Sequence, residues 1–136
     1  MRAIPRLALL TGAFIVAAWF GLGWVQARDI GRAQSLVGAS SLSRAEARRA
    51  ESLLNTARTL NPDQTVAITR AQLYQKVRQP QRAVTILEQV TRAEPLNLEA
   101  WRELSIAAYA LPASPNHTRL AEDAFKRVLS LLAVQK

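Results

Sequence analysis

The stretch RAEPLNLEAW, residues 92–101, places a proline between one helix-like run and a tryptophan that opens another. A proline has no backbone N–H and its ring clashes with the preceding turn, so a helix cannot continue through Pro95. The segment TLNPDQTVA, residues 59–67, is broken in the same way by Pro62. We therefore interpret each break as the end of one helical hairpin in a repeat.

The apolar positions before these two prolines coincide when the copies are aligned with Pro62 against Pro95. A third copy follows the second at a slightly longer spacing. The coinciding positions are Ala50, Leu54, Ala57 and Pro62 in the first copy, Ala83, Leu87, Val90 and Pro95 in the second, and Ala121, Phe125 and Val128 in the third. The period is about the length of one helix–turn–helix unit, which is typical of stacked helical repeats.

Five runs of the chain place apolar residues three and four positions apart, which is the spacing of one face of an α-helix. No run shows the strict apolar and polar alternation of a half-buried strand. We therefore predict an all-α fold. The predicted helices span residues 44–60, 65–77, 81–93, 98–110 and 118–133.

Local signals predict how several of these helices begin and pack. Ser43 and Glu46 are three residues apart and predict a capping box. Asn97 is expected to cap the helix after Pro95, with Trp101 wedged between neighbouring hairpins. The last helix has an apolar face that we expect either the tail or a partner to cover. That face comprises Leu120, Ala124, Val128, Leu131 and Leu132.

The period resembles the tetratricopeptide repeat family, a 34-residue helical hairpin with small residues where its two helices cross. The matching positions are Ala71, Tyr74, Ala83, Leu87, Val90 and Pro95 in the middle copy, and Trp101, Leu104, Ala121 and Phe125 in the last. The chain departs from the family at Ala67 and Arg70, and by extra residues within 111–118. The resemblance covers most of residues 30–134. It implies a short α-solenoid of about 2.5 to 3 hairpins over residues 44–136.

The first part of the chain differs in composition. Residues 7–25 carry no charge and would form about 28 Å of helix, close to the thickness of a bilayer's hydrocarbon core. We predict a transmembrane helix over residues 7–27. A short tail, residues 1–6, would precede it, and residues 28–43 would form a connecting helix and turn.

A cleaved secretory signal peptide is the alternative reading, because Arg2 and Arg6 are followed by an apolar run and a small-residue motif at Val25-Gln26-Ala27. The run is longer than a usual signal sequence, and Trp19 and Trp24 suit a membrane interface. Small residues spaced by four would also let the helix pack closely against another membrane helix. These residues are Ala13, Ala17 and Gly21.

The Arg- and Ala-rich composition looks bacterial, so the predicted span indicates a single-pass protein of the bacterial inner membrane. The positive charges flanking the span lean only slightly towards an inside N-terminus. A short leading tail favours export of the rest of the chain, so we expect the repeat domain on the extracytoplasmic side. The chain has no cysteine, and disulfide usage therefore gives no guide to the compartment.

From residue 28 onward, 16 Arg and Lys residues stand against 10 Asp and Glu residues, a net charge of +6. Such a surface could attract anionic lipid, nucleic acid or an acidic partner. The cations are scattered along amphipathic helices and no nucleic-acid recognition signature is present, which argues against nucleic acid.

Catalytic groups are not evident in the sequence. His117 is the one histidine and lies in a proline-rich segment without a neighbouring nucleophile or orienting acid. No cluster of His and Cys suggests a metal site, and no Gly-rich phosphate loop suggests a nucleotide. We therefore expect no enzyme activity, no cofactor and no metal.

The resemblance implies that ligands bind along the concave face, which the first helix of each hairpin supplies. The implied contact residues are Ile68, Gln72, Gln75 and Lys76 in the middle copy, and Glu99, Arg102, Ile106 and Tyr109 in the last. Family members that clamp a peptide's terminal carboxylate use lysine and asparagine on this face. Ile68 and Gln72 take two of those positions, so the resemblance implies a different peptide or a protein surface.

Our leading hypothesis is a membrane-anchored scaffold or accessory subunit that mediates protein–protein interaction within or onto a larger membrane complex. An auxiliary role in cell-envelope polysaccharide biogenesis is a second hypothesis, because a membrane helix followed by such repeats also resembles the end of some bacterial polysaccharide polymerase or ligase-like proteins. A basic domain that binds anionic lipid or nucleic acid is a third. The sequence leaves self-association open.

Overall fold

The computed structural model describes residues 30–39, 42–60 and 64–134, and all regular secondary structure within these ranges is helical. The predicted all-α fold is therefore confirmed for this part of the chain. A short helix covers residues 30–38. The helices that follow it are α2 (Arg44–Leu60), α3 (Gln64–Lys76), α4 (Pro80–Ala93), α5 (Leu98–Tyr109) and α6 (Pro115–Val134).

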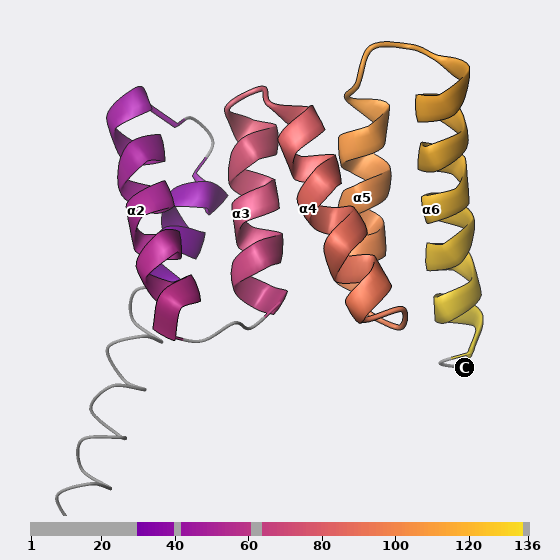
Figure 1. Cartoon of the computed structure of the whole chain (residues 1–136), viewed down its shortest axis with the longest axis horizontal. Helices are drawn as coiled ribbons and strands as arrows, with labels where there is room; N and C mark the ends of the chain where they lie inside the picture. Colours follow the sequence, from indigo (N-terminus) through magenta and orange to yellow (C-terminus); the bar gives the residue numbers. More distant parts are fainter. Residues whose placement is uncertain (1–29, 40–41, 61–63, 135–136) are drawn as a thin grey trace, which may run out of the picture.

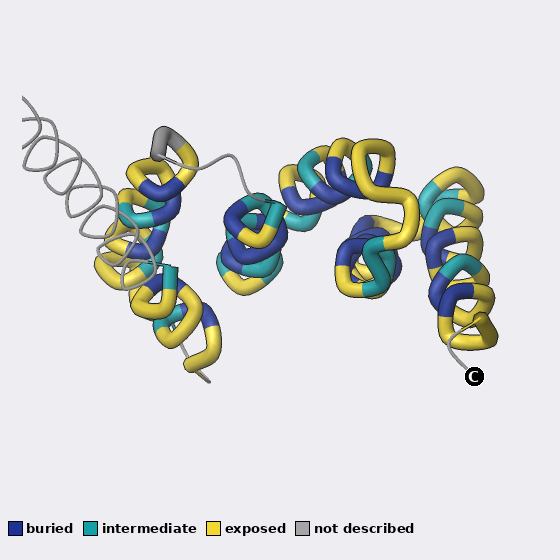
Figure 2. Tube along the Cα trace, turned by 90° about the horizontal axis from the view of Figure 1, so that it is seen from below, coloured by how far each residue is buried: buried dark blue, intermediate teal, exposed yellow. Residues whose placement is uncertain are grey.

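The helices stand side by side in chain order and run alternately up and down (Figure 1). Each of α3 to α6 packs against the helix before it, and α3 also contacts α5. Because α3 and α5 touch, α4 lies to one side of them. Seen along the helix axes, buried residues face the neighbouring helices and exposed residues face outward (Figure 2).

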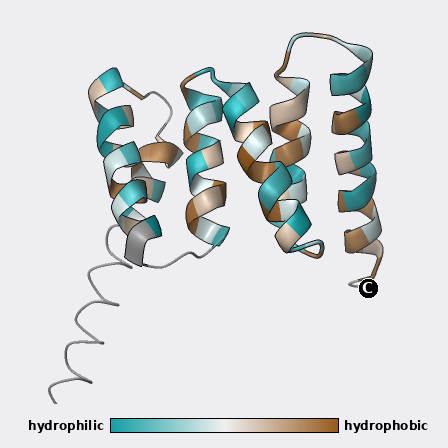
Figure 3. Cartoon of the chain, in the orientation of Figure 1, coloured by the Kyte–Doolittle hydropathy of each residue, from teal (hydrophilic) through white to brown (hydrophobic). Residues whose placement is uncertain are grey.

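Two buried clusters form the core, and α3 belongs to both. Val66 and Leu73 pack with apolar residues of α2 and of the helix of residues 30–38. Ile68, Ala71 and Tyr74 pack with residues of α4, α5 and α6. Hydrophobic residues are concentrated where helices face each other, most visibly between α4 and α5 (Figure 3). The core therefore runs along the array, as expected when each hairpin buries its apolar surface against the next.

Fully buried alanines lie where the helices pack against one another. Ala71, Ala83 and Ala121 are among the positions that carry the family resemblance, and each is 0% exposed. A side chain without atoms beyond Cβ lets two helix backbones approach closely. A larger residue at any of these positions would force the helices apart.

The predicted and observed helix boundaries agree closely except at α6. The sequence predicts a loop through His117, but α6 already begins at Pro115. The hydroxyl of Ser114 accepts a hydrogen bond from the N–H of His117 at 3.2 Å. Proline fits the first helical position because its missing N–H would have no partner there. The Nδ1 atom of His117 lies 2.8 Å from the carbonyl oxygen of Pro112, so its side chain folds back onto the loop.

The predicted capping box at the start of α2 is confirmed. The hydroxyl of Ser43 accepts a hydrogen bond from the N–H of Glu46 at 3.2 Å, and the carboxylate of Glu46 accepts one from the N–H of Ser43 at 2.8 Å. These bonds favour the charged form and lower the pKa of Glu46 below its ordinary value. Their contribution to stability is therefore present above that ordinary value and is lost as the pH falls through the folded-state pKa.

The predicted cap of α5 is also confirmed. The side chain of Asn97 accepts a hydrogen bond from the N–H of Ala100 at 3.0 Å. The indole N–H of Trp101 donates to the carbonyl oxygen of Pro95 at 3.0 Å, and its ring packs against the larger core cluster. The proline that ends one hairpin is thus tied directly to the helix that opens the next.

The turn between α3 and α4 contains a residue in the left-handed conformation. Arg78 has a φ of 59°, which is sterically costly for a residue with a Cβ atom. The N–H of Gln79 donates to the carbonyl oxygen of Tyr74 at 2.8 Å, and the N–H of Arg78 donates to that of Gln75 at 3.0 Å. These two bonds form a Schellman motif, in which the left-handed residue is usually glycine. Arginine at this position therefore carries strain that glycine would not.

Replacing this arginine should stabilise the protein. We expect Arg78→Gly to raise the free energy of unfolding by about 1 kcal/mol, because glycine adopts the left-handed conformation without the Cβ clash. The matched control is Arg49→Gly in the exposed part of α2, which should lower it by about 1 kcal/mol. Thermal unfolding followed by circular dichroism measures both changes. A lowered midpoint for Arg78→Gly would contradict the strain at this turn.

In the part of the chain that the structure describes, no helix is long and apolar enough to cross a membrane. The transmembrane helix predicted over residues 7–27 lies outside the described residues. The same holds for its predicted packing stripe, Ala13, Ala17 and Gly21.

Candidate functional site

Polar side chains that join α3 to α5 gather around the carboxylate of Glu103. This residue is 6% exposed. Its Oε1 accepts hydrogen bonds from the amide of Gln72 at 3.3 Å and from the guanidinium of Arg102 at 3.0 Å, and its Oε2 accepts one from the amide of Gln75 at 3.2 Å. A buried carboxylate requires such donors, because an uncompensated buried charge is strongly destabilising. The cluster thus fastens the two helices to each other.

The predicted contact residues of α3 do not form an open surface. Ile68 is 4% exposed and belongs to the core, so its assignment to a binding face is corrected here. Gln72 and Gln75 are half-buried and donate their amide hydrogens within the cluster just described. Lys76 is exposed, and its ammonium donates to the carbonyl oxygen of Ala39. Because α3 has core contacts on two sides, little of its surface is left for a ligand.

The predicted contact residues of α5 do lie together on the surface. Glu99, Arg102, Ile106 and Tyr109 follow one another at helical spacing and are all exposed. Ile106 is 49% exposed and Tyr109 is 63% exposed, so the stripe presents apolar surface to solvent. This stripe therefore remains available to a partner.

A second exposed apolar surface lies on α6. Phe125, Leu129 and Leu132 are 50%, 51% and 44% exposed. Their spacing of four and three residues places them on one flank of the helix. We call these three residues the end face. No segment among the described residues covers them.

The repeat itself shows how unusual this exposure is. Phe125 corresponds to Leu87 in the copy before it, and Leu87 corresponds to Leu54 in the first copy. Leu54 and Leu87 are both 0% exposed, whereas Phe125 is half exposed. The difference arises because a further helix packs after α2 and after α4, but none of the described residues packs in the same way after α6.

The apolar face predicted for the last helix is only partly the open one. Ala124, Val128 and Leu131 are buried, and Leu120 is partly buried and packs against the core. Leu132 alone of the predicted five lies on the end face. Most of the predicted apolar face of α6 packs against α5. The end face is rotated from it about the helix axis by roughly a quarter turn.

Glu103 is not among the residues predicted from the sequence, although its hydrogen-bond partners Gln72, Gln75 and Arg102 are. Gln72 lies 31 residues away from Glu103 and Gln75 lies 28 residues away, so no local pattern links them. An Arg102-Glu103 pair in a helix also looks like ordinary surface charge. A carboxylate at a position that the helical period assigns to the core was the one available signal.

The described residues bring few chemically reactive groups together. Among the described residues, no group of three or more His, Cys, Asp and Glu side chains could hold a metal ion. The ring of His117 contacts the backbone carbonyl oxygen of Pro112, and the hydroxyl of Ser114 is bound to the backbone N–H of His117 and not to its ring. Comparison with protein-family models, with curated proteins and with solved structures finds no match to this chain.

Proposed function

We propose that this protein is a non-catalytic scaffold or accessory subunit, built from tetratricopeptide-like hairpins and anchored in a membrane by residues 7–27, that binds a partner protein through its end face. The supporting observation is the half exposure of Phe125 at a repeat position that is fully buried in the two preceding copies. A helix or helical hairpin of the partner would lie along α6, in the place that another hairpin would take. Exposed apolar surfaces of this kind mark protein contacts.

The end face alone would bind weakly. Burying the remaining surface of Phe125, Leu129 and Leu132 would contribute on the order of 3 kcal/mol. Association itself costs more than this, so other contacts are required. The exposed stripe of α5 that holds Ile106 and Tyr109 offers further apolar area. A shared bilayer would raise the effective concentration of the two proteins, as a tether does.

Charged substitutions on the end face should release the partner. We expect the double variant Phe125→Glu, Leu129→Glu to reduce co-purification of the partner with the full chain by at least about tenfold, because a buried unpaired carboxylate opposes docking. The measurement is affinity purification of the full chain in mild detergent from the cells that make it. Mass spectrometry then quantifies the proteins recovered.

The matched control is Leu96→Glu, which places a carboxylate at another exposed leucine. Leu96 is 76% exposed in the turn between α4 and α5 and does not belong to the end face. We expect this variant to recover the partner as the unaltered chain does. Equal recovery by the end-face variant, or an equal loss with Leu96→Glu, would contradict the proposal.

A further inference from the structure

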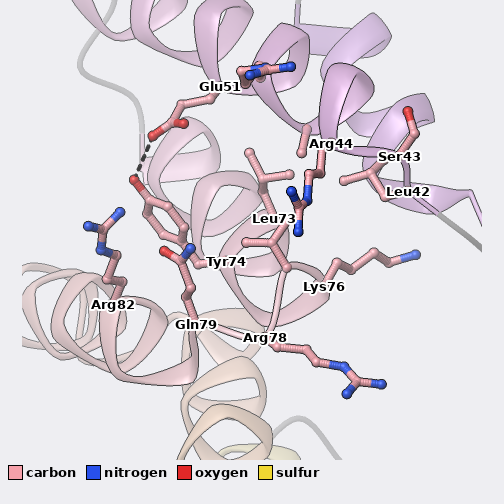
Figure 4. Close-up of a pocket in the computed structure, with 13 residues that line it drawn as sticks. Leu42, Ser43, Arg44, Glu51, Leu73, Tyr74, Lys76, Arg78, Gln79 and Arg82 are labelled. Carbon is pink, nitrogen blue, oxygen red and sulfur yellow. Dashed lines mark hydrogen bonds between the residues drawn. The ribbon is translucent and has the colours of Figure 1, made fainter.

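A basic cavity lies at the edge of the array where α3 turns into α4. It has a volume of about 490 Å³ and is bounded by the start of α2, the end of α3 and the start of α4 (Figure 4). Five cationic side chains line it, and Glu51 is the one carboxylate among the described residues that do so. The five are Arg44, Arg48, Lys76, Arg78 and Arg82. Val77, which follows α3, and Leu42, which precedes α2, add partly exposed apolar surface.

The carboxylate of Glu51 offsets one of these five positive charges and forms no ion pair with the cavity's arginines. It accepts a hydrogen bond from the hydroxyl of Tyr74 at 2.9 Å. The guanidinium of Arg82 lies 5.6 Å from the centre of the Tyr74 ring, in a cation–π contact. Within the described part of the chain, none of the four arginines of the cavity forms an ion pair with a carboxylate. The cavity therefore has a surplus of positive charge that its own residues leave unpaired.

Three of these arginines occupy positions that local structure disfavours. Arg44 is the first residue of α2 and Arg82 lies in the first turn of α4, where positive charge opposes the helix dipole. Arg78 holds the left-handed conformation that favours glycine. Fold stability does not explain three cations at such positions around one cavity. A ligand that neutralises them would.

We infer that this cavity binds an acidic peptide segment of a partner protein, with side-chain carboxylates meeting the arginines and an apolar residue between them meeting Leu42 and Val77. The guanidinium fork matches a carboxylate with two parallel hydrogen bonds. The volume suits a few residues of peptide and lies within the range of ordinary ligand pockets. The site is separate from the α5 stripe, and it shares only Lys76 with the contact residues that the family resemblance implies.

The shape of the site favours a protein over a lipid surface. The cavity lies at the end of the array that holds the α3–α4 turn (Figure 1). A flat bilayer would reach the exposed rim of such a site more readily than the apolar residues between the arginines.

The test measures binding of a labelled, end-blocked peptide with two glutamates before a leucine and two aspartates after it. Fluorescence anisotropy follows its binding to the full chain in mild detergent. We expect Arg44→Gln and Arg48→Gln each to weaken binding by about tenfold, as loss of a charge-assisted hydrogen bond should. Arg49→Gln is the matched control, because Arg49 neighbours Arg48 on α2 and is exposed but does not line the cavity. We expect it to leave the affinity within about twofold.

Four results would overturn the inference: no binding of the peptide, an equal effect of Arg49→Gln, equal binding of a peptide with amides in place of the carboxylates, or binding of anionic vesicles with the same dependence on Arg44 and Arg48. The last would assign the cavity to lipid headgroups. Arg78→Gly separates binding from folding, since it should weaken the peptide complex while raising the unfolding midpoint.

The inference rests on the proposed scaffold function, because it names the chemistry of one partner segment. The two can still fail independently. If Phe125→Glu, Leu129→Glu releases the partner but Arg44→Gln and Arg48→Gln leave peptide binding unchanged, the scaffold proposal stands and the cavity site falls. If the arginine variants lose the peptide while the end-face variant retains its partner, the cavity is a binding site and the end face is not.

Discussion

Leu87→Ala should lower the free energy of unfolding by about 3 kcal/mol, the typical cost of emptying a fully buried leucine site. Leu87 is 0% exposed in the cluster that joins α4 to α5. Its side chain closes the interface between two hairpins, and the cavity left behind cannot be filled from solvent. Denaturant unfolding of the full chain in mild detergent, followed by the helical circular dichroism signal, measures the change.

The equivalent position in the last copy is the control. We expect Phe125→Ala to cost less than about 1 kcal/mol, although phenylalanine is the larger side chain, because half of Phe125 is already in contact with water. A large loss of stability with Phe125→Ala would mean that the end face is covered within the protein. That outcome would remove the observation on which the scaffold proposal depends.

Glu103→Ala should also be strongly destabilising, by about 2–3 kcal/mol, because a buried hydrogen-bond acceptor is lost. The substitution removes the acceptor of hydrogen bonds from Gln72, Gln75 and Arg102, and leaves two half-buried amides without their partner. The same unfolding measurement reports it. The loss should come with weaker contact between α3 and α5, seen as faster amide hydrogen exchange in both helices.

Glu99→Ala is the matched control on the same helix. Glu99 is exposed, and its one hydrogen bond in the described structure is a long contact of 3.5 Å with the amide of Gln72. We expect a cost below about 0.5 kcal/mol. Similar costs for Glu99→Ala and Glu103→Ala would show that the buried carboxylate does not hold the helices together.

The helices were predictable because their signals are local. Proline at Pro95, the cap at Asn97 and the three- and four-residue apolar spacing each act within a few residues of the chain, so the order and limits of α2 to α5 follow from them. Ser114-Pro115 is also a helix start of this kind. The predicted start of α6 is too late because Pro115 was interpreted as a residue that ends a helix. Proline is in fact favoured at the first position of a helix.

The surfaces were less predictable because they depend on which helices touch. A helical period predicts which face of a helix carries apolar residues such as Ile68 and Phe125. It does not predict that other helices cover α3 on two sides and α6 on only one. Glu103 illustrates the same limit, since its partners come from another helix. The basic cavity brings together residues from three helices and a turn, and no stretch of sequence contains them.

The measurement that tests the central claim most directly is photo-crosslinking in the cells that make the protein. A photoreactive phenylalanine analogue would replace Leu129 on the end face, or Ser130 on the neighbouring exposed surface as the control. Successive residues of a helix point about 100° apart, so the two probes sample different sides of α6. We predict a crosslink to a second protein from position 129 and a much weaker one from position 130. Equal yields at both positions, or no crosslink at position 129, would contradict a partner seated on the end face.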